Sequence, residues 1–163
     1  MKLWLAALAL LALPATAQAS NGLFIESNDA LANVAQISAA GDGNRLMIEQ
    51  SYDGGPGANT LALTISGDFN GAPSASTQFS PLLMTIGLVP GRVVQSGHNN
   101  SIAMSVTGDH NIYAVLQMGA GNRLTGTVTG FSNQAAIAQY GSGNALTFIQ
   151  NGTGNMLSVI QRN

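Results

Sequence analysis

The sequence contains no cysteine, and only 7% of its 163 residues are charged. Without cysteine, disulfide bridges cannot stabilise the fold. So little charge is common in membrane proteins, but beyond residue 20 no apolar run approaches the roughly 18–20 residues that a spanning helix needs. Basic residues are also scarce: after Lys2 the chain has four arginines against seven acids, and a net charge of 4 − 7 = −3 gives no basic surface for nucleic acid.

The one long apolar run lies at the start of the chain. Lys2 is followed by the apolar residues 3–13 and then by the small-residue pattern Ala17-Gln18-Ala19. A short basic region, an apolar core of about 11 residues and an A-x-A site together indicate a secretory signal peptide. We therefore assign residues 1–19 to a signal peptide and expect the mature chain to start near Ser20. The alternative is an N-terminal anchor that stays in place.

What the sequence has in abundance is a repeat of 11 residues. Six Asn residues recur at this spacing and each follows a Gly by three residues: Asn100, Asn111, Asn122, Asn133, Asn144 and Asn155 follow Gly97, Gly108, Gly119, Gly130, Gly141 and Gly152. The same phase appears upstream from Asn33 to Asn44 and from Asn59 to Asn70. A fixed period sustained over this length indicates a repeat architecture rather than a compact globule.

Between the Asn residues, apolar and small polar residues alternate. Positions two, four and six after each Asn form one face of an extended segment, because side chains alternate along a strand. The predicted core residues on this face include Ile102, Met104, Val115, Ile137, Leu146, Phe148, Leu157 and Val159. The opposite face carries mainly Ser, Thr and Ala, although Leu116 and Ile149 also point that way. This pattern predicts strands joined by turns, and a glycine in every unit opposes a helix.

The predicted fold is all-β. Two 11-residue arms make one strand–turn–strand unit, and about five stacked units form a β-solenoid with two facing parallel sheets. The turn glycines permit positive φ, and each Asn can bond the neighbouring backbone. The chain divides into an N-terminal segment (20–32), degenerate repeats (33–70), an insertion or loop (71–92) and regular repeats (93–163). Within the insertion, Pro81 to Leu88 could still contribute a strand.

A second ladder is made of glutamines. Gln95, Gln117, Gln139 and Gln161 are spaced by 22 residues, which places one on the same sheet in each unit. Gln150 holds the equivalent position on an intervening arm. Amides stacked about 4.8 Å apart can donate and accept along the column, which offsets the cost of burying them. We therefore assign these five Gln and the six Asn to structural ladders. The alternative is that the Gln residues are solvated at strand ends.

The stretch from Asn133 to Gln161 resembles the curlin repeats of bacterial curli fibre subunits, whose units follow roughly S-x5-Q-x-G-x-G-N-x-A-x3-Q. Gln139-x-Gly141-x-Gly143-Asn144-x5-Gln150 is the closest match. The resemblance covers 93–163 well and 33–70 in degraded form. The leading Ser is mostly absent, 71–92 fits nothing, and the glycine before Asn is replaced by Asn99, His110 and Ser132.

This resemblance implies a secreted structural subunit, either the major fibre former or the minor nucleating subunit. It implies export through an outer-membrane channel with periplasmic accessory proteins, assembly with itself or another curlin subunit, and an extracellular amyloid that serves adhesion and biofilm matrix. Growth would proceed by addition of strands to the open ends of the solenoid.

Other classes of protein fit the residues less well. Carbohydrate-active β-helix enzymes need clustered acids, whereas Asp42, Asp68 and Asp109 look like scattered turn residues that discourage lateral association. His98 and His110 fall at opposite ends of a unit, so we expect no metal site, cofactor or catalytic group. The Thr columns of an ice-binding solenoid and the nine-residue repeat of a calcium-binding β-roll are both broken or missing. A monomeric secreted solenoid that displays 71–92 for binding is the alternative outside the family.

Overall fold

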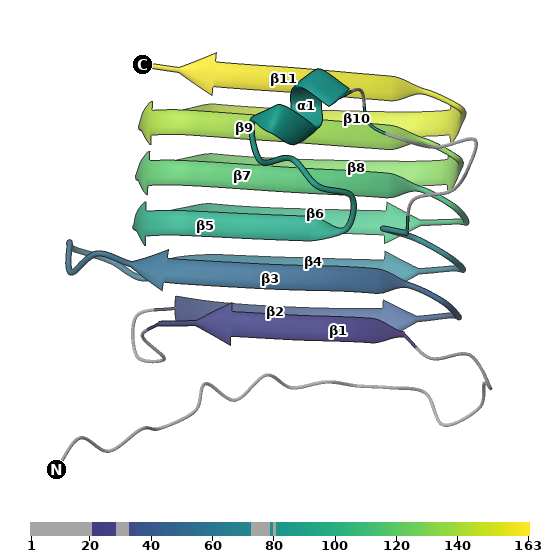
Figure 1. Ribbon diagram of the computed structural model, residues 1–163, viewed down its shortest axis with the longest axis horizontal. Helices are drawn as coiled ribbons and strands as arrows, with labels where there is room; N and C mark the ends of the chain where they lie inside the picture. The colour runs from purple at the N-terminus through teal and green to yellow at the C-terminus, as the bar shows by residue number, and fades with distance from the viewer. Residues whose placement is uncertain (1–20, 29–32, 73–78, 80) are drawn as a thin grey trace, which may run out of the picture.

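The computed structural model describes residues 21–28, 33–72, 79 and 81–163. The predicted signal peptide, 1–19, lies outside these residues, as does most of the start of the insertion, 73–78. The described chain contains eleven strands and one short helix (Figure 1). Within it, no helix is long and apolar enough to cross a membrane.

The strands form two parallel sheets that face each other. The six-stranded sheet contains, in order, β1 (Gly22–Ser27), β3 (Arg45–Tyr52), β5 (Arg92–His98), β7 (Ile112–Ala120), β9 (Gln134–Ser142) and β11 (Met156–Arg162). The five-stranded sheet contains β10 (Ala145–Thr153), β8 (Arg123–Phe131), β6 (Ser101–Thr107), β4 (Asn59–Ser66) and β2 (Asn33–Ala40). The chain alternates between the sheets, so each successive pair of strands is one turn of a coil. The predicted β-solenoid with two facing parallel sheets is confirmed, with six strands in one sheet where roughly five turns were expected.

The additional turn comes from β1, in a segment that the repeat did not reach. Ile25 of β1 pairs with Ile48 of β3 and packs against the core. Asn21 stands 12 residues before Asn33, one more than the repeat allows, so the period concealed this strand.

A dry core lies between the sheets. Alternate residues of each strand point into it, as in β4, where Leu61, Leu63 and Ile65 are buried and the residues between them are exposed. Of the predicted core residues, Ile102, Met104, Val115 and Ile137 lie fully inside, whereas Leu146, Phe148, Leu157 and Val159 are partly buried in the last two strands. Gly126 interrupts the apolar run for a reason of volume, because a Cβ there would overlap the ring of Phe148.

The insertion does not add a strand. Pro81–Thr85 forms the helix α1, which lies over the outer face of the six-stranded sheet (Figure 1). Phe79, Leu83 and Leu88 form a second apolar cluster with outward residues of β7 and β9. The suggestion of a strand at Pro81 to Leu88 is therefore wrong. The edges of β5 are already paired with β3 and β7, so this segment can bury its apolar side chains only by lying across the sheet. Its described part is not a free loop.

The turns explain two features of the repeat. Gly119 has a φ of 115°, and a Cβ there would overlap the carbonyl oxygen of Gly141 in the next turn, so only glycine fits. Asn99, His110 and Ser132, which replace a glycine of the curlin pattern, have φ values of 55°, 57° and 54°. The backbone thus keeps its left-handed conformation where the sequence departs from the pattern, at a cost of about 1–2 kcal/mol for each non-glycine residue.

Candidate assembly site: the amide ladders and the open sheet edges

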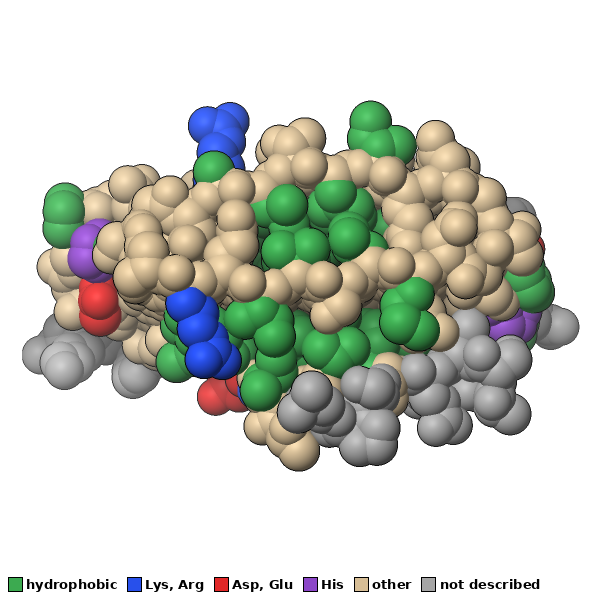
Figure 2. Space-filling view, turned by 90° about the horizontal axis from the view of Figure 1, so that it is seen from above, with side chains coloured by type: hydrophobic (Ala, Val, Ile, Leu, Met, Phe, Trp, Pro, Cys, Tyr) green, Lys and Arg blue, Asp and Glu red, His purple; other side chains and the backbone are tan. Residues whose placement is uncertain are grey.

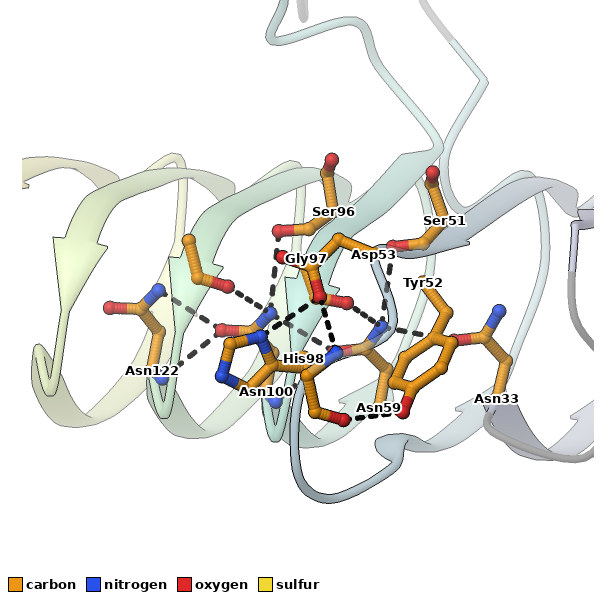
Figure 3. A network of polar contacts seen from close by, with 12 residues as sticks. Asn33, Ser51, Tyr52, Asp53, Asn59, Ser96, Gly97, His98, Asn100 and Asn122 are labelled. Carbon is orange, nitrogen blue, oxygen red and sulfur yellow. Dashed lines mark hydrogen bonds and ion pairs between the residues drawn. The ribbon is translucent and has the colours of Figure 1, made fainter.

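Asparagine side chains form two continuous columns along the solenoid. One column lies at the start of the strands of the five-stranded sheet and contains Asn33, Asn59, Asn100, Asn122 and Asn144. The other lies before the strands of the six-stranded sheet and contains Asn21, Asn44, Asn70, Asn111, Asn133 and Asn155. In the first column, Nδ2 of Asn122 lies 3.0 Å from Oδ1 of Asn100 (Figure 3). Nδ2 of Asn100 lies 3.0 Å from Oδ1 of Asn59, and Nδ2 of Asn59 lies 2.9 Å from Oδ1 of Asn33. Every step has the same direction, because each Asn donates to the Asn of the preceding turn.

Each asparagine in the interior of a column also ties together the turns above and below it. The backbone N–H of Asn122 donates to Oδ1 of Asn100 at 3.1 Å, and its Nδ2 donates to the carbonyl of Gly141 in the following turn at 3.0 Å. The side chain is fully buried, so unmade hydrogen bonds would be expensive. This geometry accounts for the pairing of Asn with Gly in the repeat. Asn122 bonds the carbonyl oxygen of Gly141, and a Cβ at Gly119, three residues before Asn122, would overlap that same oxygen.

The glutamines form one column with the opposite direction. Nε2 of Gln95, Gln117 and Gln139 donates to Oε1 of the next Gln at 3.1, 2.8 and 2.7 Å, ending at Gln161. Gln50 joins at the other end, with Nε2 2.8 Å from Oε1 of Gln95. The 22-residue spacing does not reveal Gln50 as a member of this column, because the insertions place it 45 residues before Gln95.

Gln150 does not belong to this column. It lies on β10 in the other sheet, where the register places it beside Val128, and donates to the carbonyl of Gln134 at 3.2 Å. Its Oε1 is buried and has no hydrogen-bond partner among the described residues. Its assignment to the structural ladder is corrected on that ground: a lone amide among apolar neighbours has no second amide with which to bond.

The acids that looked scattered in the sequence are stacked in the structure. The backbone N–H of Asp42 donates to Oδ1 of Asp68, and that of Asp68 to Oδ1 of Asp109, both at 2.8 Å. The insertions make the spacings 26 and 41 residues, which hid the column. The carboxylates of Asp68 and Asp109 thus serve as acceptors for turn N–H groups, whereas the buried Oδ1 of Asp42 has no hydrogen-bond partner among the described residues. Among the described residues, no group of three or more His, Cys, Asp or Glu is placed to hold a metal ion.

The two histidines lie in different surroundings. Nδ1 of His98 lies 2.9 Å from Oδ1 of Asp53 in the turn that follows β3 (Figure 3). The pKa of the exposed Asp53 is lowered, first by the backbone N–H of Gly55 and then by His98. His110 lies between the rings of Phe69 and Phe131, at centroid distances of 5.2 and 5.1 Å. The structure therefore does not bring the two histidines together.

Both ends of the solenoid expose unpaired strand edges. Among the described strands, β10 and β11 have a neighbour on one side only, as do β1 and β2 at the other end. Figure 2 looks onto the end that carries β11, where hydrophobic side chains fill the space between the two rows of backbone. Leu146, Phe148 and Val159, together with Leu157, are the partly buried core residues of these last two strands. Each column of amides and each sheet thus has an unfinished end.

Comparison with protein-family models, with curated proteins and with solved structures gives no match. The likeness to curlin repeats accordingly rests on the residues of this chain alone.

Proposed function

We propose that this chain is the building block of a curli-like amyloid: a secreted structural subunit that assembles with copies of itself into extracellular fibres for adhesion and biofilm matrix. It would join other subunits by strand addition, with no cofactor and no catalytic step. The proposal extends to the partners that the curlin resemblance implies, namely another curlin subunit, an outer-membrane channel and periplasmic accessory proteins.

The observation that supports this function is the state of the two ends. Monomeric proteins generally protect free sheet edges with charges, proline, bulges or a covering segment. Here β10 and β11 together carry one charged residue, Arg162, and expose Ile149, Met156 and Ile160 at 74%, 68% and 45%. Such an end is better suited to binding a second copy than to facing water. A docking strand would pair with the free backbone N–H and C=O groups and would also bury the apolar side chains.

Assembly of the chain from Ser20 tests the proposal. The described solenoid begins at Asn21, so this chain contains every strand of the described residues. Diluted from denaturant to micromolar concentration, it is expected to form fibres without any added cofactor, with strand spacing near 4.7–4.8 Å and sheet spacing near 10 Å by diffraction. A protein that stays monomeric for days under these conditions would contradict the proposal.

Two substitutions on β11 provide a matched control. Val159 points into the core and Ser158 points outward from the same strand. Val159→Asp places a charge where the next subunit must seat its own core, so seeded elongation should fall at least tenfold, whereas Ser158→Asp should change it little. A chain that fails to extend its own fibres but seeds another curlin-type subunit would indicate the nucleating role instead.

A further inference from the structure

We infer that successive subunits in the fibre are related by a half turn about the solenoid axis, with β1 of the incoming copy pairing on β10 and its β2 pairing on β11. This inference rests on the proposed self-assembly and specifies the partner surface: the opposite end of a second copy.

The amide ladders fix which ends meet. In the described chain, the Oδ1 atoms of Asn144 and Asn155 are the last acceptors of their columns and receive no hydrogen bond. At the other end, Asn21 uses its Nδ2 on the carbonyl of Gly41 and its Oδ1 on the N–H of Asn44, both at 2.9 Å. Every later Asn of this column donates its backbone N–H to Oδ1 of the Asn in the preceding turn. The backbone N–H of Asn21 has no such acceptor among the described residues. Two identical ends brought together would place acceptor against acceptor, so donor must meet acceptor and the contact is head to tail.

The levels of the strands fix the rotation. Each Gln of the column donates sideways to the carbonyl of the residue that follows the Asn at the start of the preceding strand, as Gln117 does to Ser101 and Gln139 to Arg123, both at 3.2 Å. Because consecutive strands alternate between the two sheets, each strand of the six-stranded sheet also lies one step further along the coil than the strand that precedes it. At the end of the described coil, β11 stands above β10 (Figure 1). The next position along the coil is consequently the free edge of β10.

The incoming copy begins with a strand of the other sheet. Its β1 belongs to the six-stranded sheet, whereas the vacant position lies on the five-stranded one, because the described coil has an odd number of strands, eleven. A half turn brings β1 onto β10 and then β2 onto β11, and every position is filled. Without the half turn, β1 would lie on β11 and the nine-residue edge of β10 would keep an empty strand position. Buried backbone groups left without partners are costly, which favours the half turn.

The repeat sets the register of this contact. If Asn21 of the incoming copy continues the column above Asn144, Leu23 lies over Leu146 and Ile25 over Phe148, which closes the core. On the outer face, Phe24 lies over Thr147 and Glu26 over Ile149. Without the half turn, the same two residues would instead lie over Ser158 and Ile160.

Cysteine cross-linking distinguishes these arrangements cleanly, since the chain has no cysteine of its own. Paired residues on neighbouring strands lie about 4.8 Å apart, within the 4.4–6.8 Å that a disulfide spans between Cα atoms. Within one copy, β1 and β10 lie at opposite ends of the coil, so any disulfide between them joins two copies. The pair Phe24→Cys with Thr147→Cys tests the half turn, and Phe24→Cys with Ser158→Cys is its matched control.

We expect mild oxidation of fibres to link the Phe24/Thr147 variant into long covalent chains, with several-fold less linkage in the Phe24/Ser158 variant and in each single variant. Glu26→Cys with Ile149→Cys, against Glu26→Cys with Ile160→Cys, repeats the test at exposed positions should Phe24 be needed for assembly. Fibres that link through Ser158 or Ile160, or through neither set, overturn the half turn and leave the proposed function standing. Absence of fibres from the unmodified chain overturns the proposed function itself.

Discussion

Leu116 and Ile149 are both apolar and both point outward from a strand, yet Leu116 is 7% exposed and Ile149 is 74% exposed. Two features make the difference: the insertion covers the outer face at Leu116, whereas Ile149 lies on the uncovered outer face of β10, the last strand of its sheet. The six-stranded sheet is covered over β7 and β9 by the insertion, whose Phe79, Leu83 and Leu88 pack on it. The five-stranded sheet has no such cover among the described residues, and its outer face carries small residues, such as Thr125 and Thr147.

This contrast shows that one sheet is buried on two sides and the other on one. In β7 the six residues from Ile112 to Gln117 are all buried, whereas β8 alternates between buried and more exposed residues. The insertion also occupies a lateral face on which another sheet could stack. The open ends keep unpaired backbone edges together with exposed apolar side chains, in keeping with growth along the axis.

The largest expected effect contrasts the interior with the open outer face. Ile137→Asp buries an unpaired charge at a position that is 0% exposed, so it should destabilise the monomer by several kcal/mol and prevent fibre formation. Thr127→Asp lies on the outer face of the five-stranded sheet and should change stability by less than about 0.5 kcal/mol. Urea unfolding of dilute monomer measures both, and equal effects would show that the two faces of the strands are wrongly assigned.

The next effect contrasts the two outer faces directly. Leu116→Ala opens a cavity under the insertion and should cost about 2–4 kcal/mol in the free energy of unfolding. Ile149→Ala removes an exposed side chain and should stay within about 0.5 kcal/mol of the parent. Leu88→Ala, in the insertion itself, should resemble Leu116→Ala, because Leu88 is 1% exposed in the same cluster. A small effect of both Leu variants would mean that the insertion does not hold the outer face closed.

The sequence allowed the solenoid to be predicted because its regular part obeys a strict local rule. From Gly97 to Asn155, each turn repeats Gly and Asn at one spacing, so position alone reveals which side chains stack. Insertions interrupt this regular spacing in the sequence, but the stacking of the turns continues through them. Gln50 and the column of Asp42, Asp68 and Asp109 are separated by irregular spacings, yet the register restores them to single columns.

The covered face could not be predicted in the same way. Periodicity reports contacts between neighbouring turns, whereas the packing of Leu88 on β7 and β9 is a contact outside the repeat. The outward apolar residues of β7, such as Ile112 and Leu116, were a local hint, yet Ile149, which has the same pattern as Leu116, is exposed. Which of two outward apolar residues is buried depends on where the insertion returns to the chain.

A smaller effect is expected inside the covered sheet. Tyr113 is fully buried, and its hydroxyl donates to the carbonyl of Arg45 at 3.0 Å. Tyr113→Phe should therefore cost about 1 kcal/mol. Burial raises the pKa of Tyr113 above its usual range, so above about pH 10 only the unfolded chain loses this proton, and the free energy of unfolding falls as pH rises. Tyr113→Phe should flatten that alkaline slope; an unchanged slope would show that Tyr113 does not set it.

The smallest effect concerns the ion pair where the insertion rejoins the covered sheet. Arg92 begins β5, and its guanidinium donates to both carboxylate oxygens of Glu49 on β3, at 2.8 and 2.6 Å. These bonds lower the pKa of Glu49 and raise that of Arg92. Because the folded pKa of Glu49 is depressed, the pair contributes stability above the unfolded pKa of about 4.3, and this contribution is lost as pH falls through the folded value.

Both side chains are about one-third exposed, at 28% and 31%, so solvent screens the attraction and the coupling should be about 0.5 kcal/mol. A double-mutant cycle of Glu49→Gln and Arg92→Gln, measured by urea unfolding at pH 7 and pH 3, should give a smaller coupling at pH 3 than at pH 7. A coupling of the same size at both pH values would have to come from packing of the Arg92 stem against the sheet rather than from charge.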